Sequence, residues 1–378
     1  MEAGYFNYRT IVAADWLQER RFLTQWWQFY AADPHWAPPY FPTLRSALRS
    51  EHVRRCRPTY LTLEALHRPA SGQPLSGPGR PVMTLDLERP VATTAVLRHP
   101  RQREALLGLL RCVNDEATLR QLLERAAAES EASSFLGPVA LSPYLGAGVL
   151  ASHWSETPPQ DTPYDPPYLA ELLGMVMEPV AETRLYSLRV PAARTKAPVG
   201  PATLHPLKPA RLAGDLLPLV AAVCRDDGLF AAPDAAEMAF LLDWWGALAP
   251  LSGWLAEVEG RPAGFALLQP DIAPWLQRAR GGRRLWRRLG LHRAAGQTGQ
   301  ARVVLGGVSP DVRRRGIGRQ LLAASLQSAA GAGWKTLLAG PVAEQSAAAA
   351  LLLSTDARPR QRYQLFRWQV VSMSEGWW

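Results

Sequence analysis

The chain has 378 residues, but it contains few cysteines, few lysines and no long apolar run. Cys56, Cys112 and Cys224 are odd in number and scattered, so the sequence predicts neither a disulfide framework nor a metal site. Each cysteine is expected to be a small buried residue. No apolar run is long enough to span a membrane, and the N-terminus MEAGYFNYRT lacks the apolar core of a signal peptide. These absences predict a cytoplasmic protein without a membrane partner.

The composition is that of a globular protein, with 47% apolar and 20% charged residues. A chain of this length is long for a single core, which predicts two domains. The net charge of +9 comes almost wholly from arginine, because the only lysines are Lys196, Lys208 and Lys335. A basic balance permits binding of nucleic acid or another polyanion, but it does not require it.

Two common phosphate-binding motifs are absent, because the chain has neither GxxxxGK[ST] nor GxGxxG after a strand. A different segment combines a strand over Arg302–Val308, a turn at Ser309-Pro310-Asp311, and a helix from Gly318. Between strand and helix, Gly316 and Gly318 allow the backbone to approach a ligand closely, and the first N–H groups of a helix have no internal partner. The segment therefore predicts a site for a phosphate or pyrophosphate group.

The sequence Arg313-x-x-Gly316-x-Gly318 matches the pattern (Q/R)xxGx(G/A), and the segment resembles the pyrophosphate loop of the GNAT superfamily of acyl-CoA-dependent N-acyltransferases. The surrounding order of elements also fits that superfamily. These elements are a hairpin over Trp254–Val258 and Pro262–Gln269, the strand and helix above, a strand over Trp334–Leu338, a helix over Glu344–Leu353, and a strand over Tyr363–Val371.

The resemblance implies acetyl-CoA or another acyl-CoA as the cofactor and an amine as the acceptor. It implies that the edge of the strand binds the thioester and that the loop binds the pyrophosphate, chiefly through main-chain N–H groups. It also implies that a side chain on the next helix bonds the pantetheine arm. The residues at these positions are Gly306, Gly307 and Val308 on the strand, Arg313, Arg314, Arg315, Gly316, Ile317, Gly318 and Arg319 in the loop, and Gln345 on the helix.

The chain departs from the superfamily at the position of the usual general acid. GNAT enzymes often have an Asn and, seven residues later, a Tyr, whereas this chain has Gln345 and Leu352. Leu352 cannot donate a proton, so Tyr363 on the last strand is the candidate replacement. The general base is not identified by the sequence. The available carboxylates are Asp226, Asp227, Glu237, Asp243 and Asp271, and water can also take the proton.

The first half of the chain has the same order of strand, helix and strand as the second half. No (Q/R)xxGx(G/A) pattern lies between Leu110 and Thr118, so this half is expected to be divergent. Pro191–Pro209 is proline-rich without apolar periodicity and is the expected linker. The predicted elements of the first half are strands over Thr10–Ala13, Tyr60–Ala65, Glu104–Cys112, Phe135–Val139 and Arg184–Val190, a hairpin over Val82–Leu87 and Val91–Leu97, and helices over Asp15–Ala31, Glu116–Ser130 and Leu169–Met175.

With its PYDPPY segment and its opening WWQFY…DPHWAPPY, the chain resembles uncharacterised bacterial twin-GNAT proteins whose N-terminal half lacks the loop. The predicted fold class is α/β (α+β). It has two tandem GNAT-like domains, residues 1–195 and 200–378, each a mixed, mostly antiparallel sheet flanked by helices. The resemblance implies an N-acyltransferase that acts on a small-molecule or peptide amine. It leaves open whether the protein is a homodimer.

Two alternatives stay open beside this interpretation. The first is a protein that binds or senses CoA without catalysis, which the leucine at position 352 favours. The second is a polyanion- or nucleic-acid-binding protein that uses the arginine-rich segment from Arg278 to Arg293, although such segments are more often solvated surface. We expect nucleic acid not to be the partner.

Overall fold

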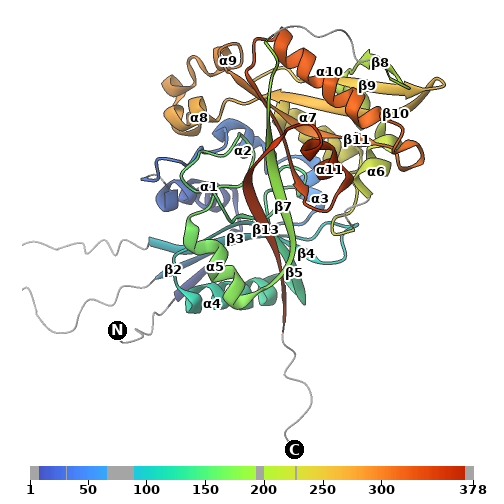
Figure 1. The fold of residues 1–378 in the computed structure, drawn as a ribbon. Coiled ribbons are helices and arrows are strands. Elements are labelled where there is room, and N and C mark those ends of the chain that lie inside the picture. The colour runs from blue at the N-terminus through green and yellow to red at the C-terminus, as the bar shows by residue number, and fades with distance from the viewer. Residues whose placement is uncertain (1–7, 31, 66–88, 193–199, 226–227, 371–378) are drawn as a thin grey trace, which may run out of the picture.

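The computed structural model describes residues 8–30, 32–65, 89–192, 200–225 and 228–370 (Figure 1). The strands of these residues form one continuous sheet in the order β1-β2-β3-β4-β5-β13-β7-β12-β11-β10-β9-β8, with β6 beside β13. The strands are β1 (Tyr8–Val12), β2 (Thr59–Ala65), β3 (Arg89–Leu97), β4 (Ala105–Cys112), β5 (Ser134–Val139), β6 (Val149–Leu150), β7 (Glu178–Arg189), β8 (Thr203–Pro206), β9 (Ser252–Val258), β10 (Arg261–Pro270), β11 (Gln300–Val308), β12 (Thr336–Ala343) and β13 (Arg358–Gln369).

Helices cover both faces of this sheet. The helices of the first half are α1 (Trp16–Tyr30), α2 (Phe41–Ala47), α3 (Glu51–Arg55), α4 (Glu116–Ser130) and α5 (Pro167–Val176). Those of the second half are η1 (Pro209–Ala213), α6 (Leu217–Cys224), α7 (Ala235–Gly246), α8 (Ala273–Ala279), η3 (Arg280–Gly282), η4 (Leu285–Arg288), α9 (Leu291–Ala294), η5 (Pro310–Val312), α10 (Ile317–Gly331) and α11 (Ala347–Leu353). Within the described residues, no helix is both long enough and apolar enough to cross a membrane.

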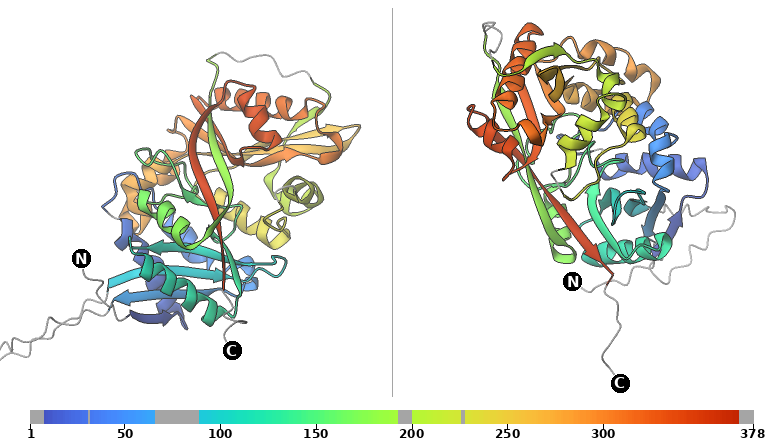
Figure 2. Two further views of the ribbon diagram at one scale, coloured as in Figure 1. Left: turned by 60° about the horizontal axis from the view of Figure 1, so that its bottom comes forward. Right: turned by 90° about the vertical axis from the view of Figure 1, so that its right-hand side faces the viewer.

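The two halves exchange strands at the middle of the sheet (Figures 1 and 2). β7 comes from the first half of the chain, yet it pairs with β12 through contacts such as Leu337 with Leu188. β13 comes from the end of the chain, yet it pairs with β5, where Phe366 lies opposite Gly137. β7 and β13 also pair with each other. The last strand of each half therefore borders the sheet of the other half.

Both halves contain a parallel strand pair joined by a long helix. In the first half β4 runs through α4 to β5, and in the second half β11 runs through α10 to β12. Both second strands carry a cis peptide bond, Gly137-Pro138 in β5 and Gly340-Pro341 in β12. This common order supports a structural equivalence of the two halves.

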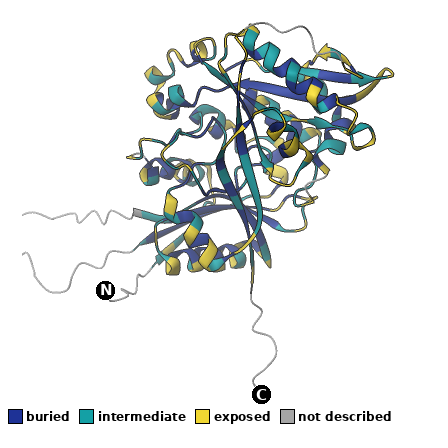
Figure 3. Cartoon of the chain, in the orientation of Figure 1, coloured by how far each residue is buried: buried dark blue, intermediate teal, exposed yellow. Residues whose placement is uncertain are grey.

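A shared apolar core joins the two halves. It includes Trp27 and Leu141 from the first half and Trp244, Phe265 and Leu267 from the second. A separate cluster lies between the sheet and the helices α10 and α11. Figure 3 shows the buried residues concentrated along the central strands, with exposed residues on the outer helices. Cys56, Cys112 and Cys224 are buried and form no disulfide within the described residues, which confirms their predicted role as small buried residues.

Several element boundaries differ from the sequence predictions. The helix predicted from Glu344 begins at Ala347, because the Ser346 side chain accepts a hydrogen bond from the Ala349 N–H and caps the helix there. The expected linker contains the short edge strand β8, which pairs with β9. The predicted strand Val82–Leu87 lies outside the described residues.

Candidate functional site

The candidate loop lies between the end of β11 at Val308 and the start of α10 at Ile317. Gly316 is the N-cap of α10 and has a φ of 87°, a backbone conformation that side chains with a Cβ rarely adopt. A Cβ at this position would have no atom within 4 Å, so the site around Gly316 is open. The positive φ at position 316 therefore favours glycine, and the space beside its Cα is open to a ligand.

The amides of the loop form a group of available donors. The first turn of α10 closes when the Gln320 N–H bonds the Gly316 carbonyl at 3.0 Å. Within the described residues, the amides of residues 316–319 donate to no backbone carbonyl. Arg314, Arg315 and Arg319 are exposed around them. The amides, the arginines and the positive end of a 15-residue helix are features that favour an anion.

The strand leading to the loop separates from its parallel neighbour. β11 pairs with β12 only from Gln300 to Val303, whereas Leu305 to Val308 pair with β10 alone. Leu268 of β10 pairs with Val303 and Leu267 with Leu305, so Val304 is an extra, bulged residue of β11 at the point of separation. Gly306 is exposed on the part of β11 that does not pair with β12. On the edge of β11 that faces β12, the main-chain groups beyond Val303 therefore have no strand partner among the described residues.

Arg313 makes a structural contact with the end of β11. Its Nε donates to the Val308 carbonyl oxygen at 3.1 Å, and the side chain is half-buried. This bond connects the loop to the end of β11. Arg313 therefore shapes the loop, while the exposed arginines supply charge at its surface.

Closely packed glycines bring helices against the loop and its strand. A Cβ on Gly318 would lie 3.2 Å from Leu351 Cδ2, so α11 packs over the start of α10. A Cβ on Gly307 would overlap Val223 Cγ1, so α6 packs directly on β11. These contacts position the loop between α6, α10 and α11.

The equivalent place in the first half is closed to an anion. The connection from Cys112 of β4 to Glu116 of α4 contains only residues 113–115. Asp115 caps α4, because its Oδ2 accepts from the Thr118 N–H at 2.8 Å. A carboxylate therefore occupies the position that an anionic ligand would need. This contact agrees with the lack of a loop motif in this half.

The other predicted site residues are not on the loop. Tyr363 lies on β13 opposite Thr183 and Leu150, and it is 1% exposed. Its hydroxyl is buried, and burial raises its pKa well above the usual value. Gln345 is exposed and precedes α11. Leu352 is buried in the cluster beneath α10 and α11. The structure therefore places the Tyr363 side chain in the core, whereas Gln345 is accessible.

The candidate carboxylates fall into different surroundings. Asp271 is buried and accepts hydrogen bonds from the amides of Gln160 at 2.9 Å and Ala273 at 3.1 Å. Burial raises its pKa above the ordinary value. Asp243 is exposed on α7, and residues 226–227 lie outside the described part of the chain. Asp271 therefore has a structural role in holding the loop that contains Gln160.

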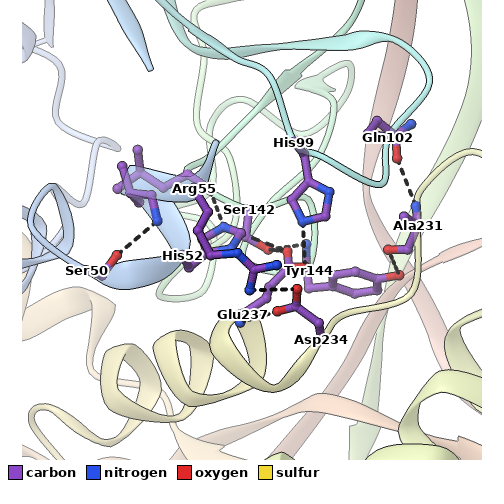
Figure 4. A network of polar contacts seen from close by, with 12 residues as sticks. Ser50, His52, Arg55, His99, Gln102, Ser142, Tyr144, Ala231, Asp234 and Glu237 are labelled. Atoms are coloured by element: carbon purple, nitrogen blue, oxygen red, sulfur yellow. Dashed lines mark hydrogen bonds and ion pairs between the residues drawn. The ribbon is translucent and has the colours of Figure 1, made fainter. Parts of the chain in front are cut away.

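Glu237 belongs to a buried polar cluster between the halves (Figure 4). Its Oε1 accepts from Ser142 Oγ at 2.8 Å, and its carboxylate lies 3.9 Å from His52 Nε2 and 3.7 Å from His99 Nε2. Burial raises the pKa of Glu237 to about 7 and lowers that of His99 to about 4. The partners are far apart in the sequence, so no local pattern groups Glu237 with the two histidines.

The arginine-rich segment packs partly against the first half. Trp27 Nε1 donates to the Arg280 carbonyl oxygen at 3.2 Å, and the Arg283 guanidinium lies 4.9 Å from the centre of the Trp27 ring. Leu285, Trp286 and Leu289 are exposed. The start of the segment is thus part of the contact between the halves, and its middle is on the surface.

Comparison with known proteins supports the resemblance seen at the loop. The acetyltransferase (GNAT) family model matches residues 222–353, which include β11, the loop and α10. This part of the chain therefore resembles that family. The comparison with curated proteins gave no match.

Solved structures resemble nearly the whole chain. A tandem GNAT protein from the clavulanic acid biosynthesis pathway has a TM-score of 0.56 and 12% identity, covering 96% of this chain and 98% of that chain. A probable N-acyltransferase from Enterococcus faecalis V583 has a TM-score of 0.54 and 8% identity, covering 96% and 72% respectively. At these identities the likeness concerns the fold alone. It confirms the predicted tandem GNAT-like fold.

Proposed function

We propose that the protein is an N-acyltransferase that moves an acetyl or other acyl group from acyl-CoA to an amine. The observation that carries the proposal is the free-amide loop of residues 316–319 beside the unpaired edge of β11. The match of residues 222–353 to the GNAT family model supports acyltransferase activity in general.

In this proposal the loop from Arg313 to Arg319 binds the pyrophosphate. Main-chain amides and the helix N-terminus supply most of the attraction, and the exposed arginines add charge. Gly306, Gly307 and Val308 offer the strand edge to the pantetheine arm and thioester, and the exposed Gln345 side chain bonds the arm. The thioester supplies the activated acyl group.

The chemistry joins the amine nitrogen to the acyl carbon and breaks the bond from that carbon to sulfur. The departing thiolate then needs a proton, and the amine must lose one. The buried Tyr363 hydroxyl is poorly placed for this donation, and the Leu352 side chain has no proton to give. We propose that water carries both protons, while the strand edge stabilises the developing oxyanion.

The two halves have different roles in this proposal. We propose residues 200–378 as the acyl-CoA-binding domain and residues 1–195 as a divergent domain that completes the sheet and shapes the acceptor site. The Asp115 cap supports this division, because its carboxylate repels a pyrophosphate from α4. The acceptor class proposed is a small-molecule or peptide amine.

Calorimetric titration of the full chain with acetyl-CoA tests the proposal. We expect Gly316→Glu to abolish binding, because its carboxylate enters the anion site. Gly333→Glu is the matched control: Gly333 lies at the other end of α10, has a φ of 77°, and has no atom within 4 Å of a built Cβ. Equal binding by Gly316→Glu and Gly333→Glu, or no binding by the wild-type chain, would overturn the proposal.

A second candidate function is binding of CoA without catalysis. The observation that favours it is the burial of both Tyr363 and Leu352, which leaves the usual general-acid position without a donor. Release of free thiol from acetyl-CoA, measured with a panel of amines, separates the two functions. Amine-dependent thiol release supports the enzyme, whereas tight binding without release supports the second candidate.

A further inference from the structure

A group of metal-ligating side chains lies where α3, the β3–β4 connection and α7 meet (Figure 4). His52 and Cys56 are four residues apart, so one turn of helix places them on the same face. His99 follows β3, and Glu237 lies in the first turn of α7. Their exposed fractions are 3% for His52, 2% for Cys56, 8% for His99 and 2% for Glu237.

The donor atoms of His52, Cys56 and His99 converge on one small space, and the Glu237 carboxylate lies beside it, 3.7 Å from His99 Nε2. Ligand atoms of His52, Cys56 and His99 all lie within 4.8 Å of one another. Bonds of about 2.0–2.3 Å in a tetrahedral zinc centre put neighbouring ligand atoms roughly 3.3–3.8 Å apart, so small side-chain movements suffice to close the site. These three side chains and Glu237 line a cavity of about 10 Å³, which holds about one water-sized sphere.

We propose that His52, Cys56, His99 and Glu237 bind one Zn²⁺ ion between the two halves of the molecule. Two nitrogens, one sulfur and one oxygen form a donor set that suits this borderline-soft ion. The thiolate and the carboxylate together balance the charge of the ion, which a buried site requires. The site is independent of acyl transfer, and its role is to fix α7 against α3.

Coordination requires a defined exchange of protons. The Cys56 S–H bond breaks, a sulfur–zinc bond forms, and the proton passes to solvent; a protonated Glu237 releases one more. His52 Nε2 lies 3.1 Å from the Leu141 carbonyl oxygen, so an Nε2–H donated there leaves Nδ1 free for the metal. His99 Nδ1 accepts from the Arg101 N–H at 3.2 Å, and coordination through Nε2 moves the ring proton to Nδ1 and breaks this bond.

Neighbouring residues keep the group in place without entering it. Asp234 caps α7 by accepting from the Glu237 N–H at 2.9 Å, and it pairs with Arg55 at 3.0 Å. Ser142 Oγ donates to Glu237 Oε1 and orients the carboxylate. The nearby arginine charge is thus matched by Asp234, while Glu237 remains directed at the two histidines, as Figure 4 shows.

The test uses the full chain, stripped with a chelator and titrated with Zn²⁺ or Co²⁺. We expect one metal ion per chain by elemental analysis, a higher melting temperature with Zn²⁺, and a thiolate-to-metal absorption band with Co²⁺. Cys56→Ser should lose the band and the shift, and His99→Gln should lose most of the affinity.

Cys112→Ser is the matched control, because Cys112 is also a buried free cysteine but lies in the core beneath α4. It should keep the absorption band and the metal stoichiometry. The Co²⁺ spectrum of the wild-type chain decides the matter even if Cys56→Ser fails to fold. A wild-type chain that binds no metal, or a band that survives in Cys56→Ser, would overturn the proposal.

Discussion

Val223 on α6 packs directly against Gly307 on β11, so closely that a Cβ on Gly307 would overlap Val223 Cγ1. We expect Gly307→Ala to lower the free energy of unfolding by about 1–3 kcal/mol, because one of the two elements must move. Val223→Ala in the same chain should recover part of the loss. A double-mutant cycle by urea denaturation measures this coupling, and additive effects of the two substitutions would contradict the contact.

We predict that the exposed arginines of the loop make the affinity for acetyl-CoA depend on salt concentration. Replacing both Arg315 and Arg319 by Ser should weaken acetyl-CoA binding by about 0.5–2 kcal/mol at low ionic strength, because two positive charges leave the anion site. The difference should shrink at high salt, where exposed charges are screened. Titration calorimetry at two salt concentrations measures it. Arg125→Ser, an exposed position on α4, removes charge elsewhere and should have no effect.

We predict that Asp271 makes the free energy of unfolding depend on pH. Burial raises its folded-state pKa above its ordinary value of 3.8, so folding is favoured most below that value and the contribution is lost as pH rises through the folded pKa. Asp271→Asn keeps an oxygen that can accept from Gln160 and Ala273 but cannot ionise. Its free energy of unfolding relative to wild type should therefore rise with pH from about 4. Parallel pH profiles for the two proteins would refute this assignment.

We predict that Gln102 stabilises the contact between the two halves. Its Nε2 donates to the Leu229 carbonyl oxygen at 2.6 Å, and its Oε1 accepts from the Ala231 N–H at 2.8 Å. We expect Gln102→Ala to cost about 1–3 kcal/mol, because two half-buried main-chain groups lose their partner. Gln102→Glu should lose the donated bond but retain the accepted one. Chemical denaturation ranks the variants, and a Gln102→Ala chain as stable as wild type would exclude this role.

Local sequence patterns predicted much of the fold correctly. The helix predicted over Glu116–Ser130 has the same bounds as α4, because Asp115 provides its cap and apolar residues repeat on one face. The strand, glycine loop and helix around Gly316 were also correctly ordered. Each of these features depends on residues within one or two turns of one another, which is the range that a sequence pattern can describe.

Features that depend on distant residues were missed. The pattern around Arg184–Val190 predicted a strand, but nothing in it indicates that β7 pairs with β12, whose partner residues lie about 150 positions later. The cluster of His52, His99 and Glu237 likewise joins three segments that contact only after folding. The three scattered cysteines implied no zinc site, and the histidine one turn before Cys56 is the local signal that could have been used.

The exchanged strands also determine how the molecule can come apart. If β7 withdrew, β12 would lose its antiparallel neighbour, and if β13 withdrew, β5 would lose its own. Either event leaves an open strand edge, which invites pairing with another chain. The arrangement is the single-chain counterpart of a reciprocally swapped dimer. A polypeptide containing one half alone would therefore tend to self-associate.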